Sequence, residues 1–361
     1  MVGQMRDSWK FCKMKSSQGY FFEDYSLGRV FTHATPLTVS AGDVSLYRAL
    51  NGNRHALFSS EPFAQLVGGP ATKIDPLIVF HIIFGKTVPD ISLNAVANLG
   101  YADGKFMHPV CIGDTLRSES EVIGHKENSS GKTGIVYVRT KGFNQNNDVV
   151  LSYVRWVMIN KRDPASPPPD TVIPELPEYV DLNGADPLKR DYKGWDDVLS
   201  GQTHRFEDYT VGERIDHIDG MTIEEAEQQL ATRLYQNTAK VHFDAHAQKD
   251  SRFGKRLIYG GVVISIARAL SFNGLANAAE LIAINAGTHC GPLFAGETVY
   301  AWSEVLQVAE LSKTTGALRL RLVATKNHPC NEFPLRDENG KYDRAVLLDF
   351  DYWAAIPRAG V

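Results

Sequence analysis

The stretch "FFEDYSLGRVF" (residues 21–31) returns later in the chain as "RFEDYTVGERI" (205–215), so that Phe22 corresponds to Phe206. A second pair of similar stretches is "HPVCIGDTLRSESEVI" (108–123) and "GPLFAGETVYAWSEVL" (291–306), where Gly113 corresponds to Gly296. The separation between matched residues differs by a single position in the two pairs. Similar segments that recur in the same order at a nearly constant separation indicate an internal duplication. The sequence therefore predicts two tandem copies of one structural unit.

A proline-rich stretch, "NKRDPASPPPDTVIPELPEYV" (160–180), lies between the two copies. Proline cannot donate a backbone hydrogen bond, so this stretch is unsuited to a helix interior or a central strand. We therefore predict a first unit over residues 17–160, a linker over 161–200 and a second unit over 201–357.

Each copy contains one segment that is apolar on every side of a helix, "PLIVFHIIFG" (76–85) and "GGVVISIARALSF" (260–272). Such a helix is expected to be buried. The segments rich in Val, Ile, Tyr and Thr that follow favour strands: "TGIVYVRTKGF", "VVLSYVRWVMI", "TVYAWSEVLQV", "ALRLRLVATK" and "RAVLLDFDYWAAI". One buried helix wrapped by a mostly antiparallel sheet in each unit predicts the α+β class.

Composition excludes several classes of function. The 361 residues are 43% hydrophobic, enough for a sizeable core, and the net charge of -4 offers no basic surface for nucleic acid. The longest apolar run is about half the length of a membrane span, and the start of the chain lacks an apolar signal core, so we expect a cytoplasmic protein. Four widely spaced cysteines predict neither a disulfide framework nor a zinc site: Cys12, Cys111, Cys290 and Cys330.

The stretch "QNTAKVHFDAHAQ" (236–248) places two histidines and one aspartate within five positions. His242 and His246 have the spacing of two metal ligands on one helix face, but no Glu follows the first histidine as in the H-E-x-x-H motif, so we predict no metal. Asp244 is a favoured helix N-cap residue, and it could also assist a catalytic histidine. The stretch alone leaves open a catalytic histidine and a plain polar helix end.

The order of elements, the glycine before "DT" or "ET", and this histidine-containing loop resemble the MaoC-like hydratases (hydratase 2) of the hotdog fold. The resemblance covers nearly the whole chain and implies a tandem double hotdog. The family's motif has Asp, four residues, then His, followed later by a His-Gly pair. Asn237 stands at the Asp position, His242 at the His position, and Gly260 at the glycine of the pair, whose histidine is replaced by Tyr259.

Within this superfamily, "YQNTAKVHFD" (235–244) and "YGGVVISIARALSFNGLANA" (259–278) are most similar to the mesaconyl-CoA hydratases, also called β-methylmalyl-CoA dehydratases. The resemblance implies a hydro-lyase that acts on an α,β-unsaturated acyl-CoA and needs no cofactor, because coenzyme A is part of the substrate. A general (R)-specific enoyl-CoA hydratase, a thioesterase and a non-catalytic acyl-CoA-binding protein are the alternatives. Assembly into a homo-oligomer is left open.

Adding water to such a thioester requires a base, an acid and hydrogen-bond donors for the enolate oxygen. His242 suits the general acid/base, since an imidazole exchanges protons near neutral pH. Asn237 is expected to orient the water or to hold the imidazole, and Asp244 is a candidate assistant. The amides of Gly260 and Gly261, at the start of the buried helix, are the predicted oxyanion hole.

A cluster of basic residues surrounds the proposed site. A guanidinium can bind a carboxylate through two parallel hydrogen bonds, and the same residues could bind the phosphates of coenzyme A or could be ordinary surface charges. The predicted substrate-binding residues are Arg233, Lys240, Arg252 and Arg256, with Lys255 beside them.

The first unit lacks the proposed machinery. The shift that carries Phe22 onto Phe206 also places Phe58 on His242 and Pro76 on Gly260. Proline has no amide hydrogen to donate, and Asp75 before it is expected to cap the helix instead. We therefore predict that the first unit is catalytically silent and serves to complete the fold, to wall the pocket or to hold part of coenzyme A.

Overall fold

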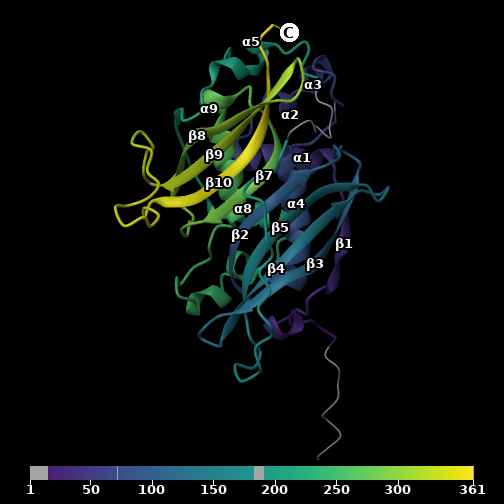
Figure 1. Cartoon of the computed structure of the whole chain (residues 1–361), viewed down its shortest axis with the longest axis vertical. Helices are drawn as coiled ribbons and strands as arrows, with labels where there is room; N and C mark the ends of the chain where they lie inside the picture. Colours follow the sequence, from purple (N-terminus) through teal and green to yellow (C-terminus); the bar gives the residue numbers. More distant parts are fainter. Residues whose placement is uncertain (1–14, 71, 183–190, 361) are drawn as a thin grey trace, which may run out of the picture.

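The computed structural model describes residues 15–70, 72–182 and 191–360. Within these residues, ten strands form one antiparallel sheet in the order β1-β3-β4-β5-β2-β7-β10-β9-β8-β6. Figure 1 shows the strands of the first half, in blue, continuing into those of the second half, in green and yellow. This arrangement confirms the predicted α+β double hotdog.

The first half begins with a 3-10 turn, η1 (Phe22–Asp24). Its strands are β1 (Val30–Thr38), β2 (Ala95–Phe106), β3 (Thr115–Glu127), β4 (Thr133–Phe143) and β5 (Val149–Asn160). Its helices are α1 (Ala41–Asn51), α2 (Ala56–Ser59), α3 (Glu61–Leu66), α4 (Pro76–Thr87) and the π-helical turn η2 (Val88–Ser92).

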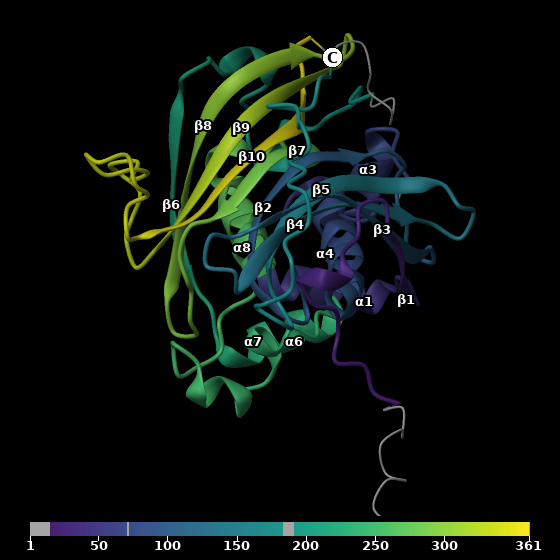
Figure 2. The same cartoon turned by 60° about the horizontal axis from the view of Figure 1, so that its bottom comes forward.

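The second half repeats this order after the short helix α5 (Asp197–Ser200) and the 3-10 turn η3 (Phe206–Asp208). Its strands are β6 (Arg214–Thr222), β7 (Glu280–His289), β8 (Thr298–Glu310), β9 (Thr315–Lys326) and β10 (Val346–Pro357). Its remaining helices are α6 (Glu225–Leu234), α7 (Lys240–Phe243), η4 (Ala247–Asp250), α8 (Gly260–Leu270) and α9 (Phe272–Leu275). Figure 2 shows α6 and α7 side by side at one end of the molecule.

The two apolar helices occupy the centre of the molecule. Every residue of α4 is buried, and so is every residue of α8 after its first, because neither helix has a polar face to present to water. The α4 helix packs against β3 and α8 against β8. As predicted, Asp75 caps α4, its Oδ1 accepting a hydrogen bond from the Leu77 amide (2.8 Å), and Pro76 is the first helical residue.

The two halves are joined by pairing of β2 with β7, two strands that the sequence patterns did not indicate. Tyr101 lies opposite Gly287 and Lys105 opposite Ala283 in this antiparallel pair. The helices of the two halves also meet, since α1 contacts both α6 and α8. One continuous core therefore runs through both halves.

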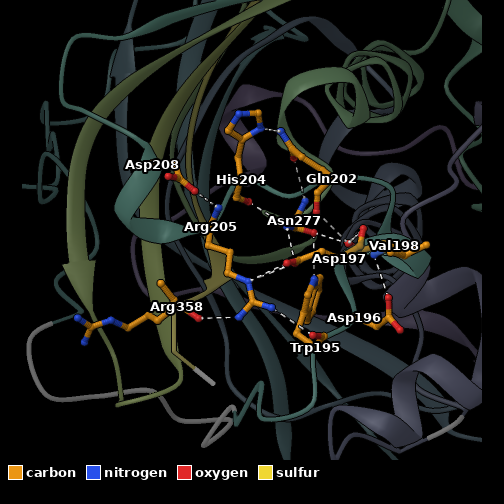
Figure 3. Close-up of polar contacts among 12 residues, drawn as sticks. Trp195, Asp196, Asp197, Val198, Gln202, His204, Arg205, Asp208, Asn277 and Arg358 are labelled. Carbon is orange, nitrogen blue, oxygen red and sulfur yellow. Dashed lines mark hydrogen bonds and ion pairs between the residues drawn. The ribbon is translucent and has the colours of Figure 1, made fainter.

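The linker is more structured than its prolines suggested. Tyr192 and Trp195 are buried and pack with Leu57 and Phe63 of the first half, because their large apolar rings gain free energy on leaving water. Figure 3 shows how the end of the linker is fixed: Trp195 Nε1 donates a hydrogen bond to Asn277 Oδ1 (3.0 Å). Residues 183–190 of the predicted linker lie outside the described residues.

The outer strands of the sheet are irregular at corresponding places. In β1 the register with β3 shifts between His33 and Leu37. In β6 the register with β8 shifts between Asp216 and Gly220. Each outer strand therefore departs from a regular ladder near its middle.

Three of the cysteines carry free thiols: Cys111, Cys290 and Cys330. Cys12 lies outside the described residues. In the part of the chain that the structure describes, no helix has both the length and the apolar composition that a membrane crossing requires.

Candidate active site

A cavity of about 430 Å³ lies between the two halves and is lined by both. It brings together four of the residues singled out in the sequence: Asn237, His242, Arg252 and Gly260. Further lining residues that matter below are Phe84, Ser92, Asn98, Tyr101, Tyr259 and His289. The cavity places the candidate base and the start of α8 on one enclosed surface.

His242 lies on the single-turn helix α7 and its half-buried ring faces the cavity. Its Nδ1 is 3.0 Å from the carbonyl oxygen of Leu257. Because a carbonyl can only accept a hydrogen bond, Nδ1 must carry the proton, and Nε2 is left with its lone pair. Burial lowers the pKa of His242 to about 4, although the hydrogen bond to Leu257 acts to raise it. The ring is therefore a neutral base at physiological pH.

Gln228 of α6 holds the His242 loop against the start of α8. Its buried side chain donates through Nε2 to the backbone oxygen of His242 (2.6 Å) and accepts through Oε1 from the Tyr259 amide (3.4 Å). One side chain thus fixes the distance between the two parts of the site. The sequence analysis did not identify Gln228, because a glutamine on an amphipathic helix carries no motif.

Asn237 is buried at the edge of the cavity. Its Oδ1 accepts a hydrogen bond from the Ala239 amide (3.1 Å), which leaves Nδ2 without a partner among the described residues. Neither atom is hydrogen-bonded to His242 within that part of the chain, so the predicted support of the imidazole by Asn237 is not seen. Asn237 can instead donate a hydrogen bond to a water or substrate oxygen.

The start of α8 has the geometry of an anion site. The first amides of a helix have no intrahelical acceptor, and the helix dipole places partial positive charge at this end. Gly260 lines the cavity, whereas Gly261 is buried and does not line it. A Cβ at Gly261 would lie 2.4 Å from the ring of Tyr259 and 2.7 Å from that of His81. Gly261 therefore has no room for a side chain, and of the two glycines Gly260 alone lines the cavity.

Asp244, a predicted assistant of His242, makes a local hydrogen bond outside the cavity lining. Its Oδ1 accepts a hydrogen bond from the amide of Ala247, the first residue of η4 (3.0 Å), and its side chain does not line the cavity. His246 is exposed and also lies outside the cavity lining. Neither residue therefore belongs to the cavity that His242 lines.

Of the predicted cationic residues, Arg252 alone lines the cavity, where it is exposed. Arg256 is paired with Glu225. Arg233 and Lys240 are exposed on the surface away from the cavity lining. The sequence-based cluster therefore separates into one cation at the site and several on the surrounding surface.

His289, the last residue of β7, is a second histidine in the cavity that the sequence analysis missed. Its Nε2 is 3.1 Å from the hydroxyl of Tyr101 on β2. Burial, with an additional contribution from the nearby His242, lowers the pKa of His289 to about 4. His289 is isolated in the sequence, and its place in the site follows from the pairing of β2 with β7.

Two further polar side chains near the cavity have buried polar atoms without a hydrogen-bond partner among the described residues. Arg155 of β5 is fully buried, with its guanidinium 4.3 Å from the ring centre of Phe84; Nη2 donates to Thr87 (2.7 Å). Its Nε and Nη1 have no partner among the described residues. The same is true of both side-chain polar atoms of Asn98, which lines the cavity.

The chain is similar to known proteins over nearly its whole length. Residues 12–175 match the mesaconyl-CoA hydratase family. Over 347 residues the chain is 58% identical to the mesaconyl-CoA hydratase of Cereibacter sphaeroides, covering 96% of this chain and 100% of that protein. Over 349 residues it is 55% identical to the β-methylmalyl-CoA dehydratase of Chloroflexus aurantiacus, covering 96% and 99%.

Solved structures give the same result. The crystal structure of a MaoC domain dehydratase from Chloroflexus aurantiacus has a TM-score of 0.93 at 55% identity, covering 96% of this chain and 100% of that one. A double hotdog protein of Mycobacterium tuberculosis has a TM-score of 0.73 at 25% identity, covering 94% and 99%. The chain therefore belongs to the mesaconyl-CoA hydratase family of MaoC-like double hotdog dehydratases.

Proposed function

We propose that the protein catalyses the reversible hydration of mesaconyl-CoA to β-methylmalyl-CoA and is a hydro-lyase without a bound cofactor. The names of its relatives at 55% and 58% identity support this substrate. The observation that carries the reaction type is that His242, with Nε2 unprotonated, and the start of α8 at Gly260 line the same cavity.

In the hydration direction, His242 Nε2 takes a proton from water as the water oxygen bonds to the β carbon. Negative charge then develops on the thioester oxygen, where the Gly260 amide and the α8 dipole stabilise it. The imidazolium returns its proton to the α carbon, so that one water is added and His242 is regenerated. Asn237 Nδ2 is suited to hold the attacking water by donating a hydrogen bond.

A free carboxylate in the substrate is consistent with the charges around the cavity. Arg155 is a buried cation without an ion-pair partner among the described residues, and it stacks on the ring of Phe84, which lines the cavity. An uncompensated buried cation favours a nearby anion more strongly than an exposed one does. Arg252, exposed at the cavity, is suited to the carboxylate or to a phosphate of coenzyme A.

We further propose a single working site in each chain. In the first half, Asn53 Nδ2 donates to Asp75 Oδ2 (2.6 Å), and the position of His242 is taken by the partly buried Phe58, packed against a cluster that includes Trp195 of the linker. That region is filled by apolar side chains, which supports a silent first half.

The proposal is tested by mixing the purified protein with mesaconyl-CoA and following the absorbance of the conjugated thioester. A hydratase consumes the conjugated thioester without releasing thiol, a thioesterase releases free thiol, and a binding protein does neither. Crotonyl-CoA, which has no free carboxylate, is the matched comparison. Equal kcat/KM on both substrates would contradict the mesaconyl assignment and indicate a general enoyl-CoA hydratase.

A further inference from the structure

His289 lies directly against the proposed oxyanion site. A Cβ placed on Gly260 would be 2.4 Å from Cε1 of His289 and 2.7 Å from both ring nitrogens. The imidazole therefore occupies the space that any larger residue at position 260 would need. The edge of the His289 ring therefore lies beside Gly260 at the start of α8, and both residues line the cavity.

The hydrogen bond with Tyr101 determines which nitrogen of His289 carries the proton. The Tyr101 hydroxyl is buried, and among the described residues its side-chain partner is Nε2 of His289. Among the described residues this hydroxyl has no other hydrogen-bond acceptor for its hydrogen, so we assign it as the donor in this bond. Nε2 must then accept, and a neutral imidazole that accepts at Nε2 carries its hydrogen on Nδ1. His289 thus presents an N–H donor next to Gly260.

His289 and Tyr101 have counterparts in the repeats, at the position where no reaction is expected. The shift that carries Gly113 onto Gly296 in this part of the repeats matches His289 with Phe106 and Tyr101 with Ile284. Gly104 packs against Ile284 as Gly287 packs against Tyr101, which agrees with this match. At the pseudo-symmetric position the donor and the residue that orients it are therefore both replaced by apolar residues, Phe106 of the first half and Ile284 of the second half.

We propose that His289 is a second oxyanion-hole donor, whose Nδ1–H binds the thioester oxygen together with the Gly260 amide. A neutral imidazole suits this role, because it donates a hydrogen bond to the enolate without transferring its proton. The two histidines then have different roles. His242, held as the Nδ1–H tautomer by the Leu257 carbonyl, accepts and returns protons at Nε2. His289 stabilises the negative charge on the thioester oxygen. This inference deepens the proposed function and rests on it.

Kinetics of His289 variants test the proposal. His289→Ala should lower kcat by about 100-fold to 1,000-fold with little change in KM, the loss expected for one oxyanion-hole donor. His289→Gln keeps an N–H donor and should recover part of the rate, and Tyr101→Phe should lose less than His289→Ala. His246→Ala, at an exposed histidine outside the cavity, is the matched control and should behave like the wild type.

A spectroscopic measurement separates this role from a structural one. In a His242→Ala background, which binds substrate without rapid turnover, the infrared carbonyl band of ¹³C-labelled mesaconyl-CoA should shift to lower frequency on binding. Adding His289→Ala should remove a large part of that shift. An unchanged shift, or kcat of His289→Ala within about threefold of wild type, would overturn the proposal.

The pH profile distinguishes charge stabilisation from proton transfer. If His289 only donates a hydrogen bond, the His289→Ala variant keeps both limbs of the wild-type pH profile at a lower rate. The loss of one limb would show that His289 transfers a proton and would refute the assigned role. Should wild-type protein fail to hydrate mesaconyl-CoA, the proposed function fails first, and the same variants are compared on an enoyl-CoA that it does hydrate.

Discussion

Nε2 of His81 and the hydroxyl of Ser265 are hydrogen-bonded at 2.8 Å, although the two residues occupy the same position in the two repeats. Corresponding positions of two related copies can touch each other only beside the axis that relates the copies. The contact therefore marks the point where α4 and α8 meet. The two residues differ, and Ser265 also accepts a hydrogen bond from Tyr47 (3.1 Å), so the axis passes through an asymmetric, buried polar cluster.

Ser265→Ala should destabilise the fold, because it leaves His81 and Tyr47 with buried polar atoms that have lost their partner. We expect the free energy of unfolding to fall by about 1–3 kcal/mol, measured by chemical denaturation. Ser129→Ala, at an exposed site, should change it by less than about 0.5 kcal/mol. A similarly small change for Ser265→Ala would mean that this cluster does not help to hold the two helices together.

His242→Ala should lower kcat for hydration by at least about 100-fold, which is typical of the loss of a general acid–base. The variant should remain folded, since His242 is half-buried at the surface of a cavity. The measurement is steady-state kinetics together with a thermal melt. Turnover near the wild-type rate would rule out His242 as the base.

The Asn237→Asp variant should move the acid limb of the pH profile. In the wild type, the His242 pKa of about 4 keeps the base neutral at higher pH, so kcat/KM should fall only as the pH drops toward 4. A carboxylate at position 237 would favour the imidazolium and raise the pKa of His242. The acid limb should then appear at higher pH in a series of kcat/KM measurements. An unchanged limb would show that residue 237 does not act on His242.

Replacing Asn98 should change substrate binding, measured as KM, without lowering the free energy of unfolding. Asn98→Leu removes two buried polar atoms that have no partner among the described residues, so the free energy of unfolding should not decrease. If these atoms contact a polar part of the acyl-CoA, KM should rise about tenfold, the cost of a lost hydrogen bond. Asn94→Leu is the contrasting control: its Nδ2 donates to backbone oxygens of Gln18 and Tyr20, so that variant should lose stability and keep its KM.

Titration with a tight-binding product analogue should give about one equivalent per chain, because the first half has no cavity-lining base among its described residues. Phe58→His alone should gain no activity, since Pro76 still lacks an amide and Asp75 caps α4. Isothermal titration calorimetry and the hydration assay check these two outcomes. Two equivalent sites, or activity in His242→Ala that depends on the first half, would contradict the comparison of the repeats.

The sequence predicted the elements whose signal is local. The repeat, the all-apolar segments 76–85 and 260–272, and the β-branched strands such as 133–143 each carry their pattern within a short stretch. The strands β2 and β7 escaped prediction because they contain glycines and polar residues and are stabilised by pairing across the two halves. Long-range pairing of this kind leaves no local pattern.

The same difference between local patterns and long-range pairing explains which site residues could be identified from the sequence. His242 and Gly260 could be identified because a family motif spans them. His289 and Arg155 lie on two separate strands and belong to no such motif. The residues of the basic cluster separate in the fold, because Arg256 pairs with Glu225 whereas Lys240 is exposed. One usable signal for His289 was present: the corresponding residue of the first half is Phe106, as Phe58 corresponds to His242.

The irregular outer strands bear on how copies of this chain can associate. Pairing of β2 with β7 leaves β1 and β6 as the ends of the sheet in the described part of the chain. An unpaired, regular strand edge is a template onto which another chain can add its own strand, which leads to aggregation. A bulge twists and bends the strand and interrupts its row of hydrogen-bonding groups. With a register shift near the middle of both end strands, neither edge offers a full-length template, so assembly of copies is directed away from edge-to-edge growth of the sheet.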